Sequence, residues 1–300
     1  MKSIFIKLLI AIPLIYLALF IGLWSSVSDT RPIISLLDMM RSDSATKIID
    51  FSSDEEKSSK PKPKPNKDRN PYYGDLHVHT KHSFDAYIFG VTATPNDAYR
   101  YAKGEGIMHP MGYEMKLQEP LDFYSVTDHG FFMGMMNAWA DTTTDISQND
   151  FALPFHNLNK EENLTVESAG PRSALFSTIL AGTIATTHGN FHPNTLKAWL
   201  TKNTQKALKS FDYDIHKSAW EDVARSANEH NDPGHFTTFI GYEFTTSTNV
   251  EGGNLHRNVI FNSSKAPIRP WTRIDSINPE DLWTWQDKLR DKGVDTVAIP

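Results

Sequence analysis

An aspartate and two histidines occupy alternate positions in residues 72–80. The segment is typical of a β-strand, in which successive side chains point to opposite faces. Asp75, His77 and His79 would then share one face, with the intervening apolar residues on the other. Three ionisable side chains on one face of a core strand are costly to desolvate unless they bind a metal ion. The alternative is an exposed edge strand with two solvated histidines, since so short a motif also arises by chance.

Further residues of ligand type lie near the ends of other predicted strands or in the loops that follow them: Asp85, Asp128, His129, Glu243 and His256. Each also has an ordinary structural explanation. Asp85 could be a turn residue, and Asp128 could cap a helix beside a surface histidine. Glu243 ends an apolar run, so it could instead form a buried ion pair with a neighbouring arginine. His256 has the weakest case, because a lone strand histidine is usually structural.

Together these residues predict a site for more than one metal ion. The predicted ligands are His77, His79, Asp85, His129, Glu243 and His256. Glu243 can bridge two ions, and two close ions can activate one water molecule. Asp75 and Asp128 are predicted to orient the ligating imidazoles. The chain has no motif for a serine or cysteine nucleophile, no H-E-x-x-H and no P-loop, which favours a metal-dependent hydrolase.

Strands and helices alternate in the part of the chain that carries these residues. Strands are predicted at 73–80, 121–126, 236–244, 255–262 and 294–299, and helices at 94–104 and 278–292. This order predicts an α/β fold with a largely parallel sheet. Reactive groups of such folds collect at the carboxyl ends of the strands, where His79, His129 and Glu243 are expected.

The N-terminus predicts export. Lys2 and Lys7 flank an apolar run over 8–24, which indicates an uncleaved signal-anchor or a cleaved signal peptide within 1–28. Residues 29–70 are predicted to be a linker, disordered and rich in lysine and proline towards its end. The domain over 71–300 is then expected on the periplasmic or extracellular side, and in the signal-anchor case residues 8–24 would hold it at the inner membrane.

The amino-acid composition limits which side chains could bind a metal and which ligands the protein could bind. The 300 residues include no cysteine, so thiolate metal sites and disulfides are excluded and a metal would be held by His, Asp and Glu. The net charge of −6 gives no electrostatic basis for nucleic-acid binding, and a small-molecule substrate is expected instead.

Three short motifs occur in the order Asp75-Leu76-His77-Val78-His79, Thr127-Asp128-His129 and Gly241-Tyr242-Glu243. In this order they resemble the motifs of the PHP (polymerase and histidinol phosphatase) superfamily. Longer strings resemble a bacterial branch of PHP-like metalloproteins that is a domain of unknown function: residues 74–80, 83–87, 94–100 and 251–257. The resemblance covers 70–300 and has little specificity over 131–235.

The resemblance implies a distorted (β/α)7 TIM-like barrel with two or three divalent metal ions, commonly zinc, manganese or iron. His77, His79 and Glu243 would hold the first ion, and Glu243 and His256 would share the second. Asp85 and His129 would contribute to a third. Most members are phosphoesterases, with relatives that act on other esters and amides. Arg257 is a possible substrate-binding residue.

Two departures from the superfamily pattern matter. The long interval over 131–235 is predicted to be an insertion that forms a lid or a substrate wall. The chain also ends at Val297-Ala298-Ile299-Pro300, where similar proteins continue to further ligands. An incomplete, C-terminally truncated barrel is therefore expected. The leading hypothesis is an exported metal-dependent hydrolase, and the rival is a non-catalytic metal- or ligand-binding module or an inactive truncated homologue.

Overall fold

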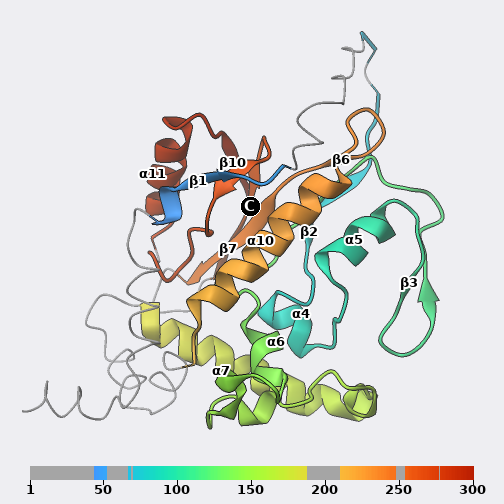
Figure 1. Cartoon of the computed structure of the whole chain (residues 1–300), viewed down its shortest axis with the longest axis vertical. Helices are drawn as coiled ribbons and strands as arrows, with labels where there is room; N and C mark the ends of the chain where they lie inside the picture. The colour runs from blue at the N-terminus through green and yellow to red at the C-terminus, as the bar shows by residue number, and fades with distance from the viewer. Residues whose placement is uncertain (1–43, 53–66, 69, 188–209, 248–253, 277) are drawn as a thin grey trace, which may run out of the picture.

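The computed structural model describes residues 44–52, 67–68, 70–187, 210–247, 254–276 and 278–300 (Figure 1). Within these residues the strands form two sheets of three strands and two of two. The parallel sheet contains β2 (Gly74–Val78), β5 (Phe123–Val126) and β6 (Thr237–Thr238). The antiparallel sheet contains β7 (Gly241–Ser247), β8 (Asn254–Phe261) and β10 (Thr296–Ile299). The small sheets pair β1 (Ile48–Asp50) with β9 (Lys265–Pro267) and β3 (Ile107–Met108) with β4 (Glu114–Met115).

The predicted TIM-like barrel is wrong. The two- and three-stranded sheets remain separate within the described residues and do not close into a barrel. The strands predicted at 73–80, 121–126, 255–262 and 294–299 occur, but the single strand predicted at 236–244 is wrong, because this segment divides into β6 and β7, which join different sheets. Only β2, β5 and β6 run parallel. The interval between β7 and β8 is six residues long, too short for a crossover helix, so β8 returns antiparallel to β7. Strand β10 then pairs antiparallel with β8.

The two larger sheets meet where the chain after β5 reaches β7. The amide of Gly130 donates to the carbonyl of Glu243 at 2.9 Å, and the amide of Glu243 donates to the carbonyl of Asp128 at 2.9 Å. A Cβ atom at Gly241 would come within 2.6 Å of the Ser125 hydroxyl, so glycine permits this close approach. The ends of β5 and β7 therefore lie side by side.

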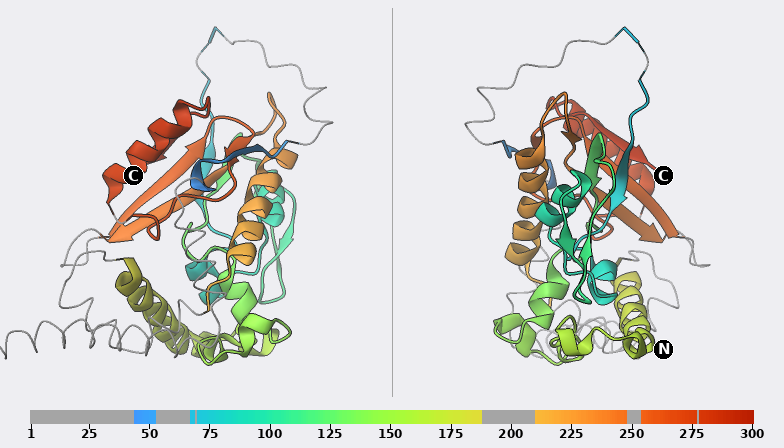
Figure 2. Two further views of the ribbon diagram at one scale, coloured as in Figure 1. Left: turned by 60° about the vertical axis from the view of Figure 1, so that its left-hand side comes forward. Right: turned by 90° about the vertical axis from the view of Figure 1, so that its right-hand side faces the viewer.

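Three helices cover one face of these sheets: α5 (Pro95–Ala102), α10 (Tyr213–His230) and α11 (Pro279–Arg290). Helix α5 begins as predicted, with Thr94 and Asp97 forming a reciprocal capping box. Figure 1 shows α10 and α5 beside β2, and Figure 2 shows α11 along the antiparallel sheet. We call this the helix-covered face. Its strand residues pack in one buried core with the helices: Tyr124, Val126, Tyr242, Phe244, Val259 and Phe261.

A second buried core forms at the end of the molecule opposite α11 (Figure 2). It joins α4 (Phe84–Ile88), α6 (Met135–Ala140) and α7 (Ala169–Thr187). Short 3-10 turns occupy Ser44–Thr46, Asp145–Gln148, Leu153–Phe155, Glu161–Asn163 and Val166–Ser168. The predicted insertion over 131–235 therefore has two parts. Residues 131–187 contribute to the second core, whereas α10 contributes Trp220 and Val223 to the main one.

Part of the predicted linker is folded. Strand β1 pairs with β9, and the Trp285 indole donates to the carbonyl of Ala45 at 2.8 Å. A three-residue strand is too short to stand out in a sequence pattern, which explains the wrong prediction for residues 44–52. The predicted N-terminal apolar helix, including 8–24, lies outside the described residues. Among the helices that are described, none has the length and apolar character needed to cross a membrane.

Candidate metal centre

A register shift in β2 sets the position of the His-x-His motif. Asp75 pairs with Tyr124 and Val78 pairs with Val126, so two residues of β2 face one residue of β5. This shift breaks the predicted alternation. Asp75 is exposed, and its carboxylate accepts the backbone N–H of His77 at 2.9 Å. His77 and His79 nevertheless both reach the same partner, Glu243.

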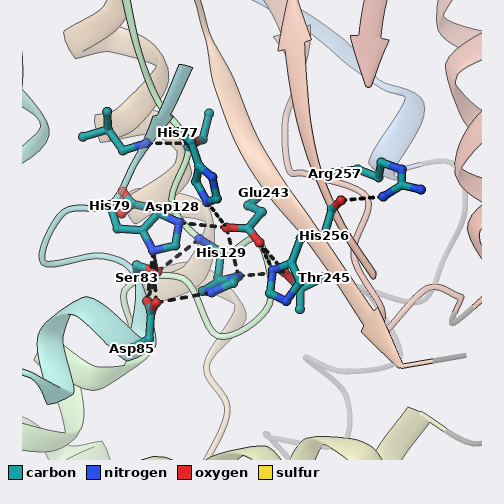
Figure 3. A network of polar contacts seen from close by, with 12 residues as sticks. His77, His79, Ser83, Asp85, Asp128, His129, Glu243, Thr245, His256 and Arg257 are labelled. Carbon is teal, nitrogen blue, oxygen red and sulfur yellow. Dashed lines mark hydrogen bonds and ion pairs between the residues drawn. The ribbon is translucent and has the colours of Figure 1, made fainter. Parts of the chain in front are cut away.

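Glu243 is the centre of the site. Its side chain is completely buried, yet it contacts imidazoles from two strands. One carboxylate oxygen lies 3.1 Å from His77 Nε2 and 2.7 Å from His79 Nε2. The other oxygen is in direct contact with His256 Nδ1. Figure 3 shows these rings converging on Glu243 from β2 and β8.

Asp85 closes the other side of the site from the start of α4. Its carboxylate lies 3.1 Å from His79 Nδ1 and 3.5 Å from His129 Nε2. Ser83 holds it there, because the Ser83 hydroxyl donates to Asp85 at 2.5 Å. The same hydroxyl accepts the backbone N–H of His129 at 3.2 Å. Asp85 and His129 are therefore fixed to each other through one buried serine.

Thr245 links the remaining two histidines. Its hydroxyl lies 2.7 Å from His129 Nδ1 and 3.3 Å from His256 Nδ1. Thr245 follows Glu243 by two residues on β7, so both side chains lie on one face of the strand. We call this the cluster face, and we call the six ligand-type residues the histidine–carboxylate cluster. It comprises His77, His79, Asp85, His129, Glu243 and His256.

The carboxylates and imidazoles of the cluster shift one another's pKa values. Burial alone would lower the pKa of His79, but hydrogen bonds with Asp85 and Glu243, and the charges of Asp85 and Asp128, raise it to about 10. Burial would raise the pKa of Asp85, but contacts with His129 and His79 hold it well below its usual range. Contacts with His256 and His79 lower the pKa of Glu243 in the same way, against the effect of burial. Asp85 and Glu243 are therefore ionised, and a positive charge between them is stabilised.

The cluster contains three groups whose donor atoms lie close enough to hold an ion. They are His77 with His79 and Glu243, His79 with Asp85 and His129, and His129 with Glu243 and His256. Imidazole nitrogens and carboxylate oxygens suit zinc and other first-row divalent ions. Ligands about 2.1 Å from one ion lie roughly 3.4 Å apart in a tetrahedral site, close to most of the separations in the cluster. The residues present therefore fit a metal.

The residues predicted to orient the imidazoles hold the backbone instead. Asp75 binds the amide of His77. Asp128 is buried, which raises its pKa, and it accepts hydrogen bonds from the amide and the hydroxyl of Thr80. Arg257 points away from the cluster, and its guanidinium donates to the carbonyl of His256 at 2.7 Å (Figure 3).

Sequence reasoning missed Ser83 and Thr245, the two hydroxyl residues that contact the imidazoles. A local signal existed for each. Ser83 follows His79 by four residues and opens α4, and Thr245 lies two residues beyond Glu243 on the same strand face. Neither pattern indicates function by itself, because serine is common at helix starts and threonine is common in strands.

Among the described residues of the cluster, His77 and His256 are the most exposed. The side chains of His77 and His256 are 56% and 41% exposed, whereas His129 is buried. The ring of Phe84 lies 4.9 Å from the His129 ring, and Phe131 lies 5.6 Å from it. These aromatic rings exclude water behind His129. A ligand would approach between His77 and His256.

The fold and the cluster together define a mixed α/β protein with a candidate metal centre. Residues 66–300 match the family described as "Protein of unknown function (DUF3604)", and the chain belongs to this family. No curated protein and no solved structure matches the chain.

Proposed function

We propose that this protein is a metal-dependent hydrolase of the PHP type, acting on a phosphoester or a related ester or amide. The observation that carries the proposal is the environment of Glu243. Its fully buried carboxylate is contacted by four imidazoles and by no lysine or arginine that the structure describes. A buried carboxylate needs a compensating positive charge, and the field that raises the pKa of His79 also favours a divalent cation.

Two or three divalent ions of zinc, manganese or iron are proposed. A neutral imidazole offers one lone pair, so a histidine shared by two groups can serve only one ion at a time. One group consists of His77, His79 and Glu243, and another consists of His129, His256 and Glu243. These two groups have only Glu243 in common. A third ion would have to be held by Asp85 and one of the shared histidines. The proposal therefore expects two tightly bound ions and a weaker third.

The proposed reaction is attack by water on the substrate. The bound ions would supply Lewis-acid activation of water and neutralise developing negative charge. A bond forms from the water oxygen to phosphorus or carbonyl carbon, the bond to the leaving group breaks, and that group takes a proton. Asp85, Ser83 and Thr245 keep the imidazoles in place. The Ser83 and Thr245 hydroxyls are themselves buried and engaged, which supports water rather than a side chain as the nucleophile.

The proposed substrate class and cellular location are based on the sequence. A small-molecule substrate is proposed, and the net charge of −6 gives no support for nucleic acid. Segment 8–24 with Lys2 and Lys7 supports export and attachment to the inner membrane, which would place the metal centre outside the cytoplasm. Protease digestion of intact spheroplasts tests this arrangement. Protection of the domain from digestion would contradict it.

Metal content is the decisive measurement for the proposed function. The full chain, purified without added metal, is expected to hold about two equivalents of a first-row transition metal. Glu243→Gln keeps the shape but removes the charge of the shared ligand, and it should lose most of the metal. Glu221→Gln is the matched control, because Glu221 pairs with Lys217 on α10. A parent without metal, even after incubation with zinc or manganese, would exclude a metal-dependent hydrolase.

Hydrolysis of aryl phosphates and aryl esters separates an enzyme from a metal-binding module. Activity that disappears on chelation and returns with metal is expected for the parent. Glu243→Gln should lower kcat/KM by at least about a hundredfold, whereas Glu221→Gln should leave it unchanged. Bound metal without chelator-sensitive hydrolysis of any of these compounds would favour the non-catalytic module.

A further inference from the structure

The cluster face of the sheets continues beyond the ligands as an apolar surface. Because of the register shift in β2, Leu76 and His77 together occupy the position opposite Ser125. Leu76 therefore lies beside His77, near Phe123 of β5, and not on the helix-covered face with Val78. The sequence pattern alone had placed Leu76 with Val78.

A cavity of about 450 Å³ occupies this surface. Its apolar walls come from Leu76, Phe123 and Phe239, and its outer rim includes Tyr72 and His235. A volume of this size is within the usual range for small-molecule sites, and such sites are lined mainly by apolar side chains with a few polar groups. The cavity is therefore large enough for a short acyl chain or an aromatic ring.

The walls of the cavity are incompletely packed. Leu76, Phe123 and Phe239 are each half-buried. Their neighbours on the opposite face, including Tyr124 and Val126, are fully buried under α5 and α10. When a ligand covers apolar surface that is in contact with water, the free energy of the system falls. Within the described residues, one apolar face of these strands is thus buried under helices and the other is only half-buried.

The cavity lies along β2 from the exposed side of the cluster, and its lining includes Leu76, the residue before His77. The imidazole of His77 is 56% exposed and contacts Glu243. Phe123 pairs with Gly74, three residues from His77 along β2. At about 3.3 Å per residue, the cavity extends roughly 10 Å from the cluster along the strands. One ligand can therefore have its polar group at the cluster and an apolar group of about six to eight carbons in the cavity.

We propose that this cavity binds the apolar part of an amphiphilic substrate, a monoester of phosphate or a carboxylic ester, whose polar group lies at the histidine–carboxylate cluster. The proposal rests on the proposed hydrolase function and adds the substrate class. It explains why three apolar side chains within about 10 Å of the cluster are only half-buried. The hydrolysable bond would be near His77, and the apolar chain would extend towards Phe123.

Alkylphosphonates test the proposal without turnover, because their carbon–phosphorus bond is not hydrolysed. Calorimetry on the full, metal-loaded chain compares ethylphosphonate with octylphosphonate. Each buried methylene strengthens binding about fourfold, so incomplete burial of six methylenes should still give a preference of at least about a hundredfold for octylphosphonate. Leu76→Ser should reduce this preference at least fivefold. Thr237→Phe should also reduce it, because the added ring fills part of the cavity.

Met115→Ser is the matched control. Met115 is a half-buried apolar residue of a short strand, and it lines a different cavity. This variant should keep the chain-length preference of the parent. Equal affinity of the parent for the two phosphonates would overturn the proposal. An unchanged preference in both Leu76→Ser and Thr237→Phe would also overturn it, even if one of the two variants were poorly folded.

The same titrations keep the two proposals separate. The chain-length ratio measures the cavity, whereas the gain in affinity between chelator-treated and metal-loaded protein measures the cluster. A strong chain-length preference that is independent of metal would support the cavity and contradict the proposed hydrolase site. Metal-dependent binding with no chain-length preference would support the metal site and overturn the inference about the substrate.

Discussion

The helix-covered face and the cluster face are formed by alternate residues of the same strands, but they bury different chemistry. On the helix-covered face, Tyr124, Val126 and Phe244 are completely or almost completely buried against α5, α10 and α11. On the cluster face, Glu243 is also buried, but its partners are imidazoles, and Leu76 and Phe123 remain half-exposed. One face therefore stabilises the fold, and the other holds the ligand-type residues and half-buried apolar surface that a bound metal and substrate would cover.

The largest expected effect of a substitution is on the helix-covered face. Trp220 is fully buried, and its indole donates to the carbonyl of Pro267 at 2.7 Å. Trp220→Ala should lower the free energy of unfolding by about 3–5 kcal/mol through cavity formation and a lost hydrogen bond. Phe239→Ala on the cluster face should cost less than half as much, because that ring is half-exposed. Denaturant unfolding measures both, and equal losses would contradict the distinction between the faces.

Metal should stabilise the protein only through the cluster face. At a free metal concentration one hundred times the Kd, binding to the folded state adds about 2.7 kcal/mol to the free energy of unfolding. Glu243→Gln should lose most of this gain, whereas Glu221→Gln on α10 should retain it. Thermal unfolding with and without zinc measures the difference. Stabilisation by zinc that survives in Glu243→Gln would place the binding site elsewhere.

The pH dependence of stability should have opposite directions for two buried histidines of the metal-free protein. The folded-state pKa of His79 is about 10, above the unfolded value of about 6.5. Its contribution is therefore complete below pH 6.5 and is lost as the pH rises towards 10. Between pH 7 and 9 the loss should be about 2–3 kcal/mol. His79→Gln should flatten this slope in urea unfolding measured across that range, and an unchanged slope would contradict the assignment.

His216 on α10 should act in the acid range. Burial, with the charge of Arg269, lowers its pKa to about 3, below the unfolded value of about 6.5. The unfolded state therefore binds the proton first, and stability is lost as the pH falls from 6.5 towards 3. His216→Gln should reduce this acid-side loss and leave the slope above pH 7 unchanged. A change above pH 7 would show that His216 and His79 are coupled.

The smallest expected effect concerns the orientation of one imidazole. Thr245→Val removes the hydroxyl that contacts His129 Nδ1 and should weaken metal binding about tenfold, equivalent to about 1.4 kcal/mol. The matched control is Thr246→Val, since Thr246 lies on the helix-covered face of the same strand. Competition with a chelator of known affinity measures both variants. Equal weakening in the two would indicate a general loss of structure, not a role for Thr245.

Much of the candidate site could be predicted from residue types. The six ligand-type residues follow from a search for histidines and carboxylates near strand ends, and the structure brings all six together. Asp75 differs from expectation because strand alternation, the basis of that prediction, is sensitive to a single register shift. Arg257 was only a possible substrate-binding residue, and no sequence pattern shows that its guanidinium donates to the carbonyl of His256. Ser83 and Thr245 could not be found because their importance depends on contacts with residues 46 and 116 positions away.

The sequence by itself determined the donor chemistry, the positions of most strands, and the starts of α5 and α11, since these depend on side-chain type, short-range periodicity and capping. Only the tertiary structure decided that β8 returns antiparallel to β7, that β1 joins the fold, and that Leu76 lies beside His77. The physical reason is the distance along the sequence over which the interactions act. Local patterns set which element forms, but strand direction, register and cavities depend on pairing between segments far apart in the chain, which no local pattern encodes.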